Sequence, residues 1–203
     1  MKPWLFGLFV LLSAPVFAQE TVPVIPFESV PNAVKLPPNL YLGEVTGVAV
    51  NSKKHIFVLS RGNTTGPAFG AAAAQLLEFG PDGRFIREIG KNLYAWAFGH
   101  TVRVDKEDNI WAVDKGSDMI VKFNPEGRVL MVFGRKQEAS DEAVPHKRTG
   151  PPPKHDDGRF RQPTDVTWDA AGNSYFSDGY VNSTHREGGQ ERQLAQVMGR
   201  AGR

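Results

Sequence analysis

Three stretches of the chain repeat one pattern, and this repetition constrains the fold more than any other feature. Each stretch has a short run of alternating apolar and polar residues, a polar turn with Asp, Asn or Gly, and a second alternating run. The stretches are VAVNSKKHIFVLSRG from Val48, VRVDKEDNIWAVDKG from Val102 and VTWDAAGNSYFSDG from Val166. Because alternation places successive side chains on opposite faces of a strand, each stretch predicts an antiparallel pair of strands.

The first two stretches continue into a further hairpin. QLLEFGPDGRFIREIG starts at Gln75 and MIVKFNPEGRVLMVFG starts at Met119. Pro-Asp-Gly and Pro-Glu-Gly form turns because proline presets φ and glycine accepts a positive φ. One repeat is therefore four short antiparallel strands, which is the pattern of a β-propeller blade. The sequence predicts an all-β chain with about two and a half blades. Insertions at residues 63–74 and 137–158 lengthen the repeats. The second is polar and proline-rich and is expected to be a surface loop, whereas the alanines at 71–74 leave a helical turn open.

The N-terminus predicts export. Lys2 precedes a short apolar run at residues 4–12, and the small residues Val16 and Ala18 suit a signal-peptidase site. The apolar run is too short for a stable membrane span, although a retained anchor is the alternative. We therefore predict a signal peptide at residues 1–18, a linker at 19–35 and blades at 36–183, in a periplasmic or secreted protein.

The last twenty residues do not continue the pattern. Residues 184–203 contain four Arg and two Glu, and the apolar alternation stops. A shift of the reading frame by one nucleotide at Thr184 restores a blade hairpin, so we predict a frameshifted tail. A divergent polar tail is the alternative. Because this tail carries most of the net charge of +2, residues 19–183 have no basic surface that would indicate a nucleic-acid partner. The chain has no cysteine, which excludes disulfides and thiolate metal sites.

Residues 36–183 resemble the peptidyl-α-hydroxyglycine α-amidating lyases, which are six-bladed propellers related to NHL-repeat proteins. The matching text is GEVTGVAVNSKKHIFVLSRG, GKNLYAWAFGHTVRVDKEDNIWAVD and RQPTDVTWDAAGNSYFSDGYVNS. QPTDV and SDGYVNS are its most specific parts. The resemblance implies a partial six-bladed propeller covering about the first half of a catalytic domain. It also implies cleavage of a C-terminal α-hydroxyglycine to a peptide amide and glyoxylate, with a peptide-like or small-molecule substrate.

The resemblance implies that His100 is a zinc ligand. In this family three histidines from different blades hold the zinc ion, and His100 in FGHTVRVD falls at the first of them. Imidazole suits Zn²⁺, and three protein ligands leave one position open for substrate. Taken alone, His100 reads as a hydrogen-bonded loop histidine. His55 reads as a surface residue, and the histidines in the insertion and tail do not replace the missing ligands. Those histidines are His146, His155 and His185.

Arg61 and Tyr180 are the expected catalytic residues. Arg61 in LSRGN matches the family's active-site arginine, although Asn63 replaces the family's acidic residue. Arginine suits a two-point grip on a carboxylate or the stabilisation of a phenolate. Tyr180 in SDGYVNS matches the catalytic tyrosine, which would take the substrate's hydroxyl proton. From the sequence alone, a rim ion pair for Arg61 and aromatic packing for Tyr180 remain alternatives.

Val48 and Val102 match the positions whose backbone carbonyls bind calcium in the family. We expect both side chains to lie in the strand core. The cofactors implied by the resemblance are therefore Zn²⁺ and Ca²⁺.

Because part of the site is missing, we expect this chain, as written, to be inactive. An open set of blades also predicts self-association through an exposed blade face and edge. Two other functions remain open: a non-enzymatic NHL-type propeller that binds a protein or glycan partner, and a propeller hydrolase or lactonase. Two further histidines in the restored reading frame would favour the lyase.

Overall fold

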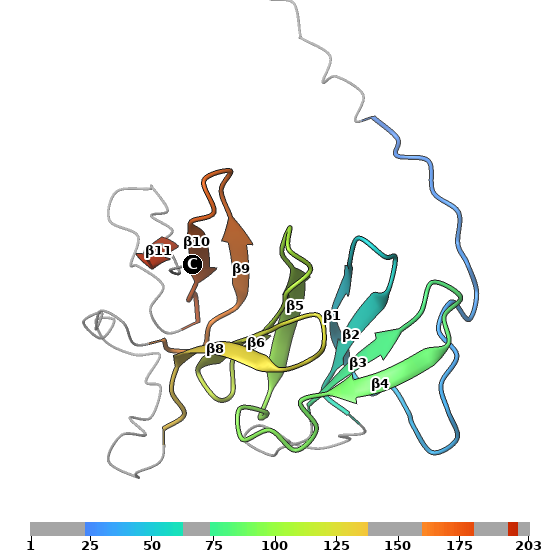
Figure 1. Cartoon of the computed structure of the whole chain (residues 1–203), viewed down its shortest axis with the longest axis horizontal. Coiled ribbons are helices and arrows are strands. Elements are labelled where there is room, and N and C mark those ends of the chain that lie inside the picture. The colour runs from blue at the N-terminus through green and yellow to red at the C-terminus, as the bar shows by residue number, and fades with distance from the viewer. Residues whose placement is uncertain (1–22, 63–73, 138–159, 181–194, 199–203) are drawn as a thin grey trace, which may run out of the picture. The chain divides into compact units, whose positions relative to one another are not determined.

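The computed structural model describes residues 23–62, 74–137, 160–180 and 195–198 (Figure 1). Residues 1–31 and 32–203 form two separate units, and every strand lies in the second. The described residues form eleven strands and no α-helix. Among these residues, therefore, no helix has the length and apolar character needed to cross a membrane. The predicted signal peptide at residues 1–18 lies outside the described residues.

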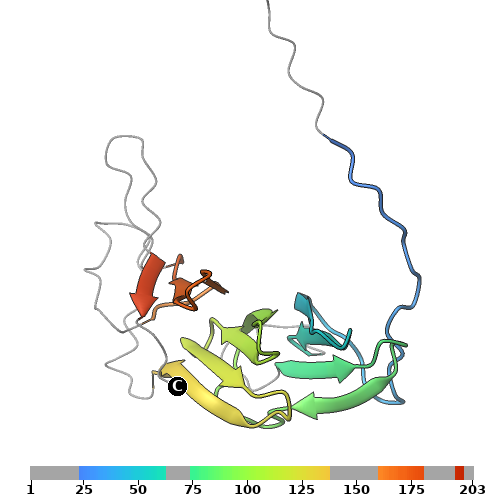
Figure 2. The same cartoon turned by 45° about the horizontal axis from the view of Figure 1, so that its top comes forward.

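The strands form three antiparallel sheets, each in simple sequence order (Figures 1 and 2). The first sheet contains β1 (Val45–Val50), β2 (Ile56–Ser60), β3 (Gln75–Phe79) and β4 (Phe85–Ile89). The second contains β5 (Gly99–Val104), β6 (Ile110–Asp114), β7 (Met119–Phe123) and β8 (Val129–Gly134). The third contains β9 (Asp165–Trp168), β10 (Ser174–Ser177) and β11 (Ala195–Met198). Two four-stranded meanders followed by a third sheet confirm the all-β, partial propeller fold.

The strand β11 lies within the polar tail. It pairs with β10, with Ser174 opposite Met198 and Ser177 opposite Ala195. The third sheet therefore takes its third strand from residues that interrupt the sequence repeat. This pairing does not test the predicted frameshift, which concerns the gene.

One side-chain turn explains the repeated sequence pattern. The side-chain oxygens of Asn51, Asp105 and Asp169 each accept a backbone N–H from the residue four positions later, at 2.8–2.9 Å. Each turn joins the first strand of its sheet to the second. Asn and Asp favour such turns because their short side chains can bond to nearby backbone groups.

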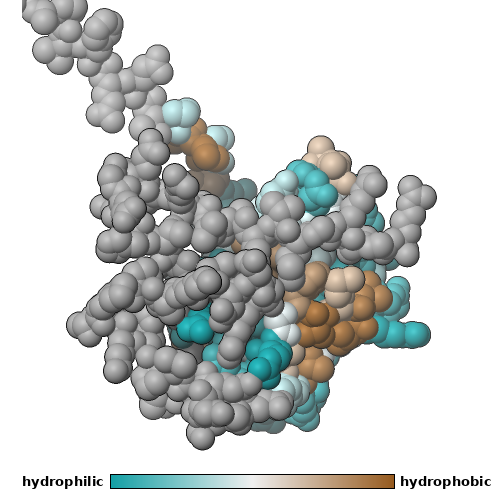
Figure 3. Space-filling view, turned by 90° about the vertical axis from the view of Figure 1, so that its left-hand side faces the viewer, coloured by the Kyte–Doolittle hydropathy of each residue, from teal (hydrophilic) through white to brown (hydrophobic). Residues whose placement is uncertain are grey.

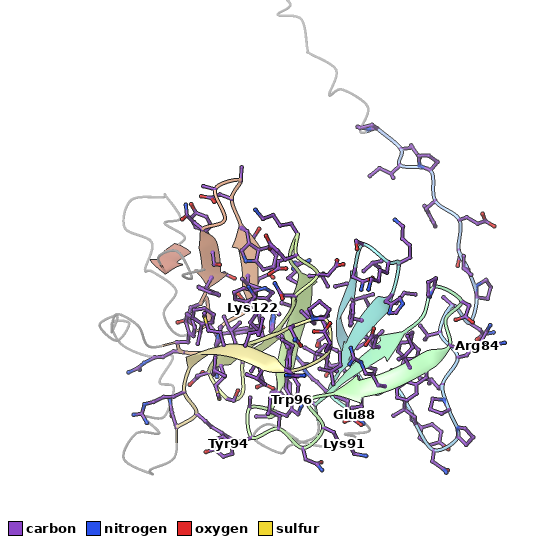
Figure 4. The ribbon with its side chains drawn as sticks, in the orientation of Figure 1. Arg84, Glu88, Lys91, Tyr94, Trp96 and Lys122 are labelled. Atoms are coloured by element: carbon purple, nitrogen blue, oxygen red, sulfur yellow. The ribbon has the colours of Figure 1, made fainter. Side chains whose placement is uncertain are left out.

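A continuous apolar core lies between the first two sheets. The buried side chains Phe57, Leu59, Trp96, Val102 and Phe123 belong to it. The Trp96 side chain lies between the two four-stranded sheets (Figure 4), and its indole N–H donates to the carbonyl of Gly90 at 2.6 Å. The first sheet is thereby packed directly on the second, as neighbouring blades are.

A second core joins the second and third sheets. Trp111 and Phe176 are buried, and the rings of Phe133 and Trp168 pack against them. The centroid of Trp111 lies 5.7 Å from that of Phe133 and 5.4 Å from that of Trp168. Phe160, just before the third sheet, is also buried in this cluster. Aromatic packing therefore determines the position of β9 and β10 against the second sheet.

The face of the first sheet that points away from the second is partly covered. Val34, Leu40 and Leu42 pack against the buried side chains Val58, Leu77 and Phe79. The backbone N–H of Lys35 also donates to the carbonyl of Gly83 at 2.7 Å. Residues 34–42 therefore shield part of a blade face that we expected to be exposed.

The first strand of that sheet is not shielded. Val48 is 54% exposed and Val50 is 52% exposed. The expectation that Val48 lies in the strand core is therefore wrong, because its side chain points away from the second sheet. Val102 is fully buried, as expected. In Figure 3, hydrophobic areas next to hydrophilic ones are exposed on the surface of the described residues. Self-association through such a face stays a prediction.

The ionisation of Asp105 makes the free energy of unfolding of the second sheet depend on pH. Burial disfavours its charged form, but hydrogen bonds from Trp111 and Asn109 and the charge of Lys122 outweigh burial. They hold the pKa of Asp105 below its ordinary value. The indole nitrogen of Trp111 lies 2.9 Å from Oδ2, and Lys122 Nζ lies 3.3 Å from it. Folding therefore favours ionised Asp105, and this contribution is present above the unfolded pKa.

We predict that the free energy of unfolding falls as the pH drops below about 4, the pKa range of an unfolded aspartate. Urea unfolding at a series of pH values measures this fall. Asp105→Asn should have a shallower acid limb, whereas the exposed control Asp82→Asn should follow wild type. An unchanged acid limb in Asp105→Asn would contradict the assignment.

Candidate active site

His100 lies on β5 with one ring nitrogen fixed by the third sheet. Its Nδ1 is 2.8 Å from the backbone carbonyl oxygen of Thr164. A carbonyl oxygen can only accept, so Nδ1 carries the proton, and Nε2 of the neutral ring keeps a lone pair. Histidines that bind metals are oriented by this kind of hydrogen bond on the other nitrogen. The geometry of His100 therefore suits a metal ligand that bonds through Nε2.

The charge state of His100 also suits that role. Burial lowers the pKa of its imidazole, and the hydrogen bond to Thr164 opposes this effect. The positive charges of Lys115 and Arg61 lower the pKa further, while Asp165 raises it slightly. The net pKa lies below the ordinary value, so the ring is neutral at neutral pH and available to a cation.

Tyr180 lies beside the Nε2 atom of His100 and can donate its hydroxyl proton to it. Its hydroxyl oxygen lies 3.4 Å from His100 Nε2, and the two rings meet edge to face with centroids 5.8 Å apart. Tyr180 follows β10 and is 47% exposed. The structure therefore brings together two residues that are 80 positions apart in the sequence. A group bound beside this pair could contact both.

Arg61 joins this cluster through the backbone next to His100. Its Nε donates to the carbonyl of Gly99 at 3.0 Å, and its Nη1 pairs with Glu44 at 2.7 Å. The guanidinium carbon lies 3.6 Å from the centroid of the Phe98 ring. The rim ion pair that the sequence left open is therefore present. The hydrogen bond to the Gly99 carbonyl places Arg61 beside the backbone of Gly99 and His100.

Lys115 is a member of the cluster that sequence reasoning missed. Its Nζ lies 3.7 Å from the centroid of the Tyr180 ring and 5.3 Å from that of Phe98. Its backbone N–H donates to the carbonyl of Phe98 at 3.1 Å. The repeat could have revealed it, because Lys115 in VDKG stands where Arg61 stands in LSRG.

Asp114 holds these elements in place. Its carboxylate is fully buried and accepts four backbone N–H groups from two segments at 2.9–3.0 Å. The donors are Ala97, Phe98, Gly116 and Ser117. One buried carboxylate therefore ties the segment before His100 to the turn that carries Lys115. Asp178 occupies the same repeat position in the third unit and accepts the N–H of Arg161 at 2.8 Å.

An ion pair places the third sheet against His100. Arg103 on β5 donates from Nε and Nη2 to the two carboxylate oxygens of Asp165 on β9, at 2.8 and 2.6 Å. Such two-point pairs restrict geometry more than single bonds do. Asp165 follows Thr164, whose carbonyl accepts from His100, so this pair positions that carbonyl. Asp165 is the aspartate of QPTDV, which the sequence singled out without a role.

Val48 and Val102 lie on β1 and β5, the first strands of neighbouring sheets. The two backbones approach so closely that a Cβ at Gly47 would lie 2.7 Å from the nitrogen of Val102. Only glycine allows this approach. The first strands of the two sheets therefore lie side by side at this point. The structure does not test calcium binding by Val48 and Val102.

The described residues do not form a complete metal-binding group. Across residues 23–62, 74–137, 160–180 and 195–198, no three His, Cys, Asp or Glu side chains gather as a metal site would require. His100 alone has the expected orientation. His55 bonds to Glu78 at 2.7 Å and is half-buried, so it is not a free surface residue. His146, His155 and His185 lie outside the described residues. The orientation of His100 is compatible with one zinc ligand, and zinc binding stays a prediction.

Sequence comparison finds relatives among the amidating enzymes. No family profile matches the chain. Peptidylglycine alpha-amidating monooxygenase of Rattus norvegicus is 28% identical over 166 residues, which cover 72% of this chain and 15% of that protein. The probable peptidyl-alpha-hydroxyglycine alpha-amidating lyase of Caenorhabditis elegans is 25% identical over 160 residues, which cover 72% and 41%. The chain thus spans less than half the length of these relatives.

Solved structures give weaker matches. A virginiamycin B lyase from Staphylococcus aureus aligns with a TM-score of 0.41 and 11% identity, over 66% of this chain and 34% of that one. A gluconolactonase from Xanthomonas campestris aligns with a TM-score of 0.38 and 14% identity, over 66% and 34%. Alignments at this level do not decide function, and the fold assignment rests on strand pairing. The described part of this chain is a partial β-propeller whose sequence resembles the peptidyl-α-hydroxyglycine amidating enzymes over part of their length.

Proposed function

We propose that this chain forms part of the catalytic propeller of an exported, zinc-dependent lyase that cleaves a C-terminal α-hydroxyglycine. The observation that supports this function is the convergence of His100 Nε2 and the Tyr180 hydroxyl, 3.4 Å apart, with Arg61 bonded to the residue before His100. All three residues were assigned to the site by the sequence resemblance. The named relatives act in peptide amidation, in agreement with this proposal.

In this proposal each side chain has one task. His100 holds zinc through Nε2, and a bound zinc ion supplies Lewis-acid stabilisation of the substrate oxygen. Tyr180, as the phenolate, would take the proton of the substrate hydroxyl and pass it to the leaving nitrogen as the C–N bond breaks. That proton makes the nitrogen the peptide amide, and the carbon becomes the aldehyde of glyoxylate. The carbonyls of Val48 and Val102 bind calcium, which stabilises the approach of the first two sheets.

The chain as given should not itself be a lyase. We expect the purified chain to bind less than one tightly held zinc ion and to release no glyoxylate from an α-hydroxyglycine-terminated peptide. The gene product with the corrected reading frame should bind one zinc ion and release glyoxylate. Metal analysis and a colorimetric glyoxylate assay measure both. Tight stoichiometric zinc in the given chain would contradict its expected inactivity, and an inactive corrected product would overturn the proposal.

Variants of the corrected product separate the roles. His100→Ala should lose tight zinc together with turnover. Tyr180→Phe should keep zinc but lose about 10²–10⁴-fold in turnover, the usual contribution of a proton-transfer group. His55→Ala is the matched control, because His55 bonds to Glu78 away from the cluster. Equal losses in His55→Ala and His100→Ala would indicate a general effect on folding.

A further inference from the structure

Two cations from consecutive sheets converge on one aromatic ring. Arg61 follows Ser60 at the end of β2, and Lys115 follows Asp114 at the end of β6, so they hold the same position in the repeat. Arg61 lies 3.6 Å and Lys115 5.3 Å from the centroid of Phe98. Glu44 is the carboxylate that pairs with Arg61, and its side chain is 65% exposed. Two cationic side chains therefore lie at this ring, and one of them is already paired with a carboxylate.

The two cations differ in their partners. The Nε and Nη1 atoms of Arg61 are engaged by the Gly99 carbonyl and Glu44. These two donors lie on different edges of the guanidinium, so each edge with which arginine grips a carboxylate at two points already has one atom in use. The ammonium group of Lys115 makes neither an ion pair nor a hydrogen bond with any described residue. It contacts the faces of Tyr180 and Phe98 instead. Lys115 therefore keeps three hydrogen-bond donors for a ligand.

We propose that Lys115 binds the carboxylate of the molecule held between His100 and Tyr180. The inference rests on the proposed function, whose substrate and glyoxylate product both end in a carboxylate. Lys115 touches the ring of Tyr180, and the Tyr180 hydroxyl faces His100, so the three groups border one site. Tyr180 orients the ammonium by a cation–π contact, and the ammonium determines specificity for an acidic ligand.

Titration of the full chain with sodium glyoxylate tests this role. Binding is followed by NMR chemical-shift changes of the His100 and Tyr180 rings at fixed pH and ionic strength. Lys115→Met should weaken binding at least about tenfold, the loss expected for one charge-assisted hydrogen bond. Lys115→Arg should retain most of the affinity because the charge remains. Lys136→Met is the matched control, since Lys136 lies 4.8 Å from the ring of Tyr94 and contributes no charge to the cluster.

Three results would overturn the inference: no saturable glyoxylate binding by wild type, equal affinity in Lys115→Met, or equal losses in Lys115→Met and Lys136→Met. Failure of the proposed function is distinguishable. If glyoxylate binding depends on Lys115 but the corrected product has no lyase activity, the carboxylate site is supported and the lyase function is contradicted. Lyase activity of the corrected product, together with unchanged glyoxylate binding in Lys115→Met, would support the lyase and rule out the proposed role of Lys115.

Discussion

Replacement of Trp111 by alanine should lower the free energy of unfolding by about 3–5 kcal/mol, the usual cost of removing a buried tryptophan. The indole is 1% exposed and packs on Phe133, Trp168 and Phe176 between the second and third sheets. It also donates to Asp105, which loses this partner in the variant. Urea unfolding followed by circular dichroism measures the change.

The same change should disturb the candidate site, because the third sheet carries Thr164 and Tyr180. NMR contacts between the His100 and Tyr180 rings should weaken or disappear in Trp111→Ala. If the alanine variant does not fold, Trp111→Phe can be used instead. It keeps an aromatic ring and should retain the contacts between the His100 and Tyr180 rings. Tyr94→Ala is the control, since Tyr94 is 58% exposed. A loss in Trp111→Ala no larger than in Tyr94→Ala would contradict the packing described for the second core.

Asp114→Ala should be the most damaging single change near the site. It removes the acceptor for four backbone N–H groups in a buried position. Each buried donor left without a partner costs about 1–3 kcal/mol, and partial relaxation keeps the total near 3–5 kcal/mol. Denaturant unfolding gives this number directly.

The variant Asp114→Asn tests whether Asp114 acts as an acceptor of backbone hydrogen bonds. Asp114→Asn keeps one acceptor oxygen and should lose less stability than Asp114→Ala. The variant replaces one acceptor oxygen by an NH2 group. Loss of the Oδ2 acceptor would leave the Ala97 N–H without its partner, so the segment before His100 should move relative to the turn of Lys115. Asp82→Ala is the control, because that carboxylate is 56% exposed and pairs with Arg84. Comparable stability in Asp114→Ala and Asp82→Ala would show that Asp114 does not anchor the site.

The fold was largely predictable because the signal is local. Alternation and the turns of Asn51, Asp105 and Asp169 specify each hairpin within about ten residues. The covering of the first sheet was not predictable, since Val34, Leu40 and Leu42 carry no periodic pattern. Whether Val48 or its neighbour faces the second sheet also depends on packing that alternation leaves open. The strand β11 comes from a segment whose composition does not indicate a strand.

The sequence motifs predicted three residues of the candidate site, but they did not predict the residues that position and surround them. The resemblance assigned His100, Arg61 and Tyr180, and these residues converge. It gave no indication of Lys115, because a lysine after a strand is usually a solvated residue. The bonds of Asp114 and the pair of Arg103 with Asp165 join segments that are distant in sequence, so no local pattern reports them. Aligning the repeats position by position would have identified Lys115 and Asp114 as site neighbours.

The most direct test of the lyase assignment is to sequence the gene across the codons for residues 182–186 and several hundred bases beyond. We predict one extra base before the codon of Thr184. The other frame should then continue with further blades and two more histidines in contexts like that of His100. An unbroken frame with no further blades and no such histidines would contradict the zinc lyase and leave a short all-β chain without a complete metal centre.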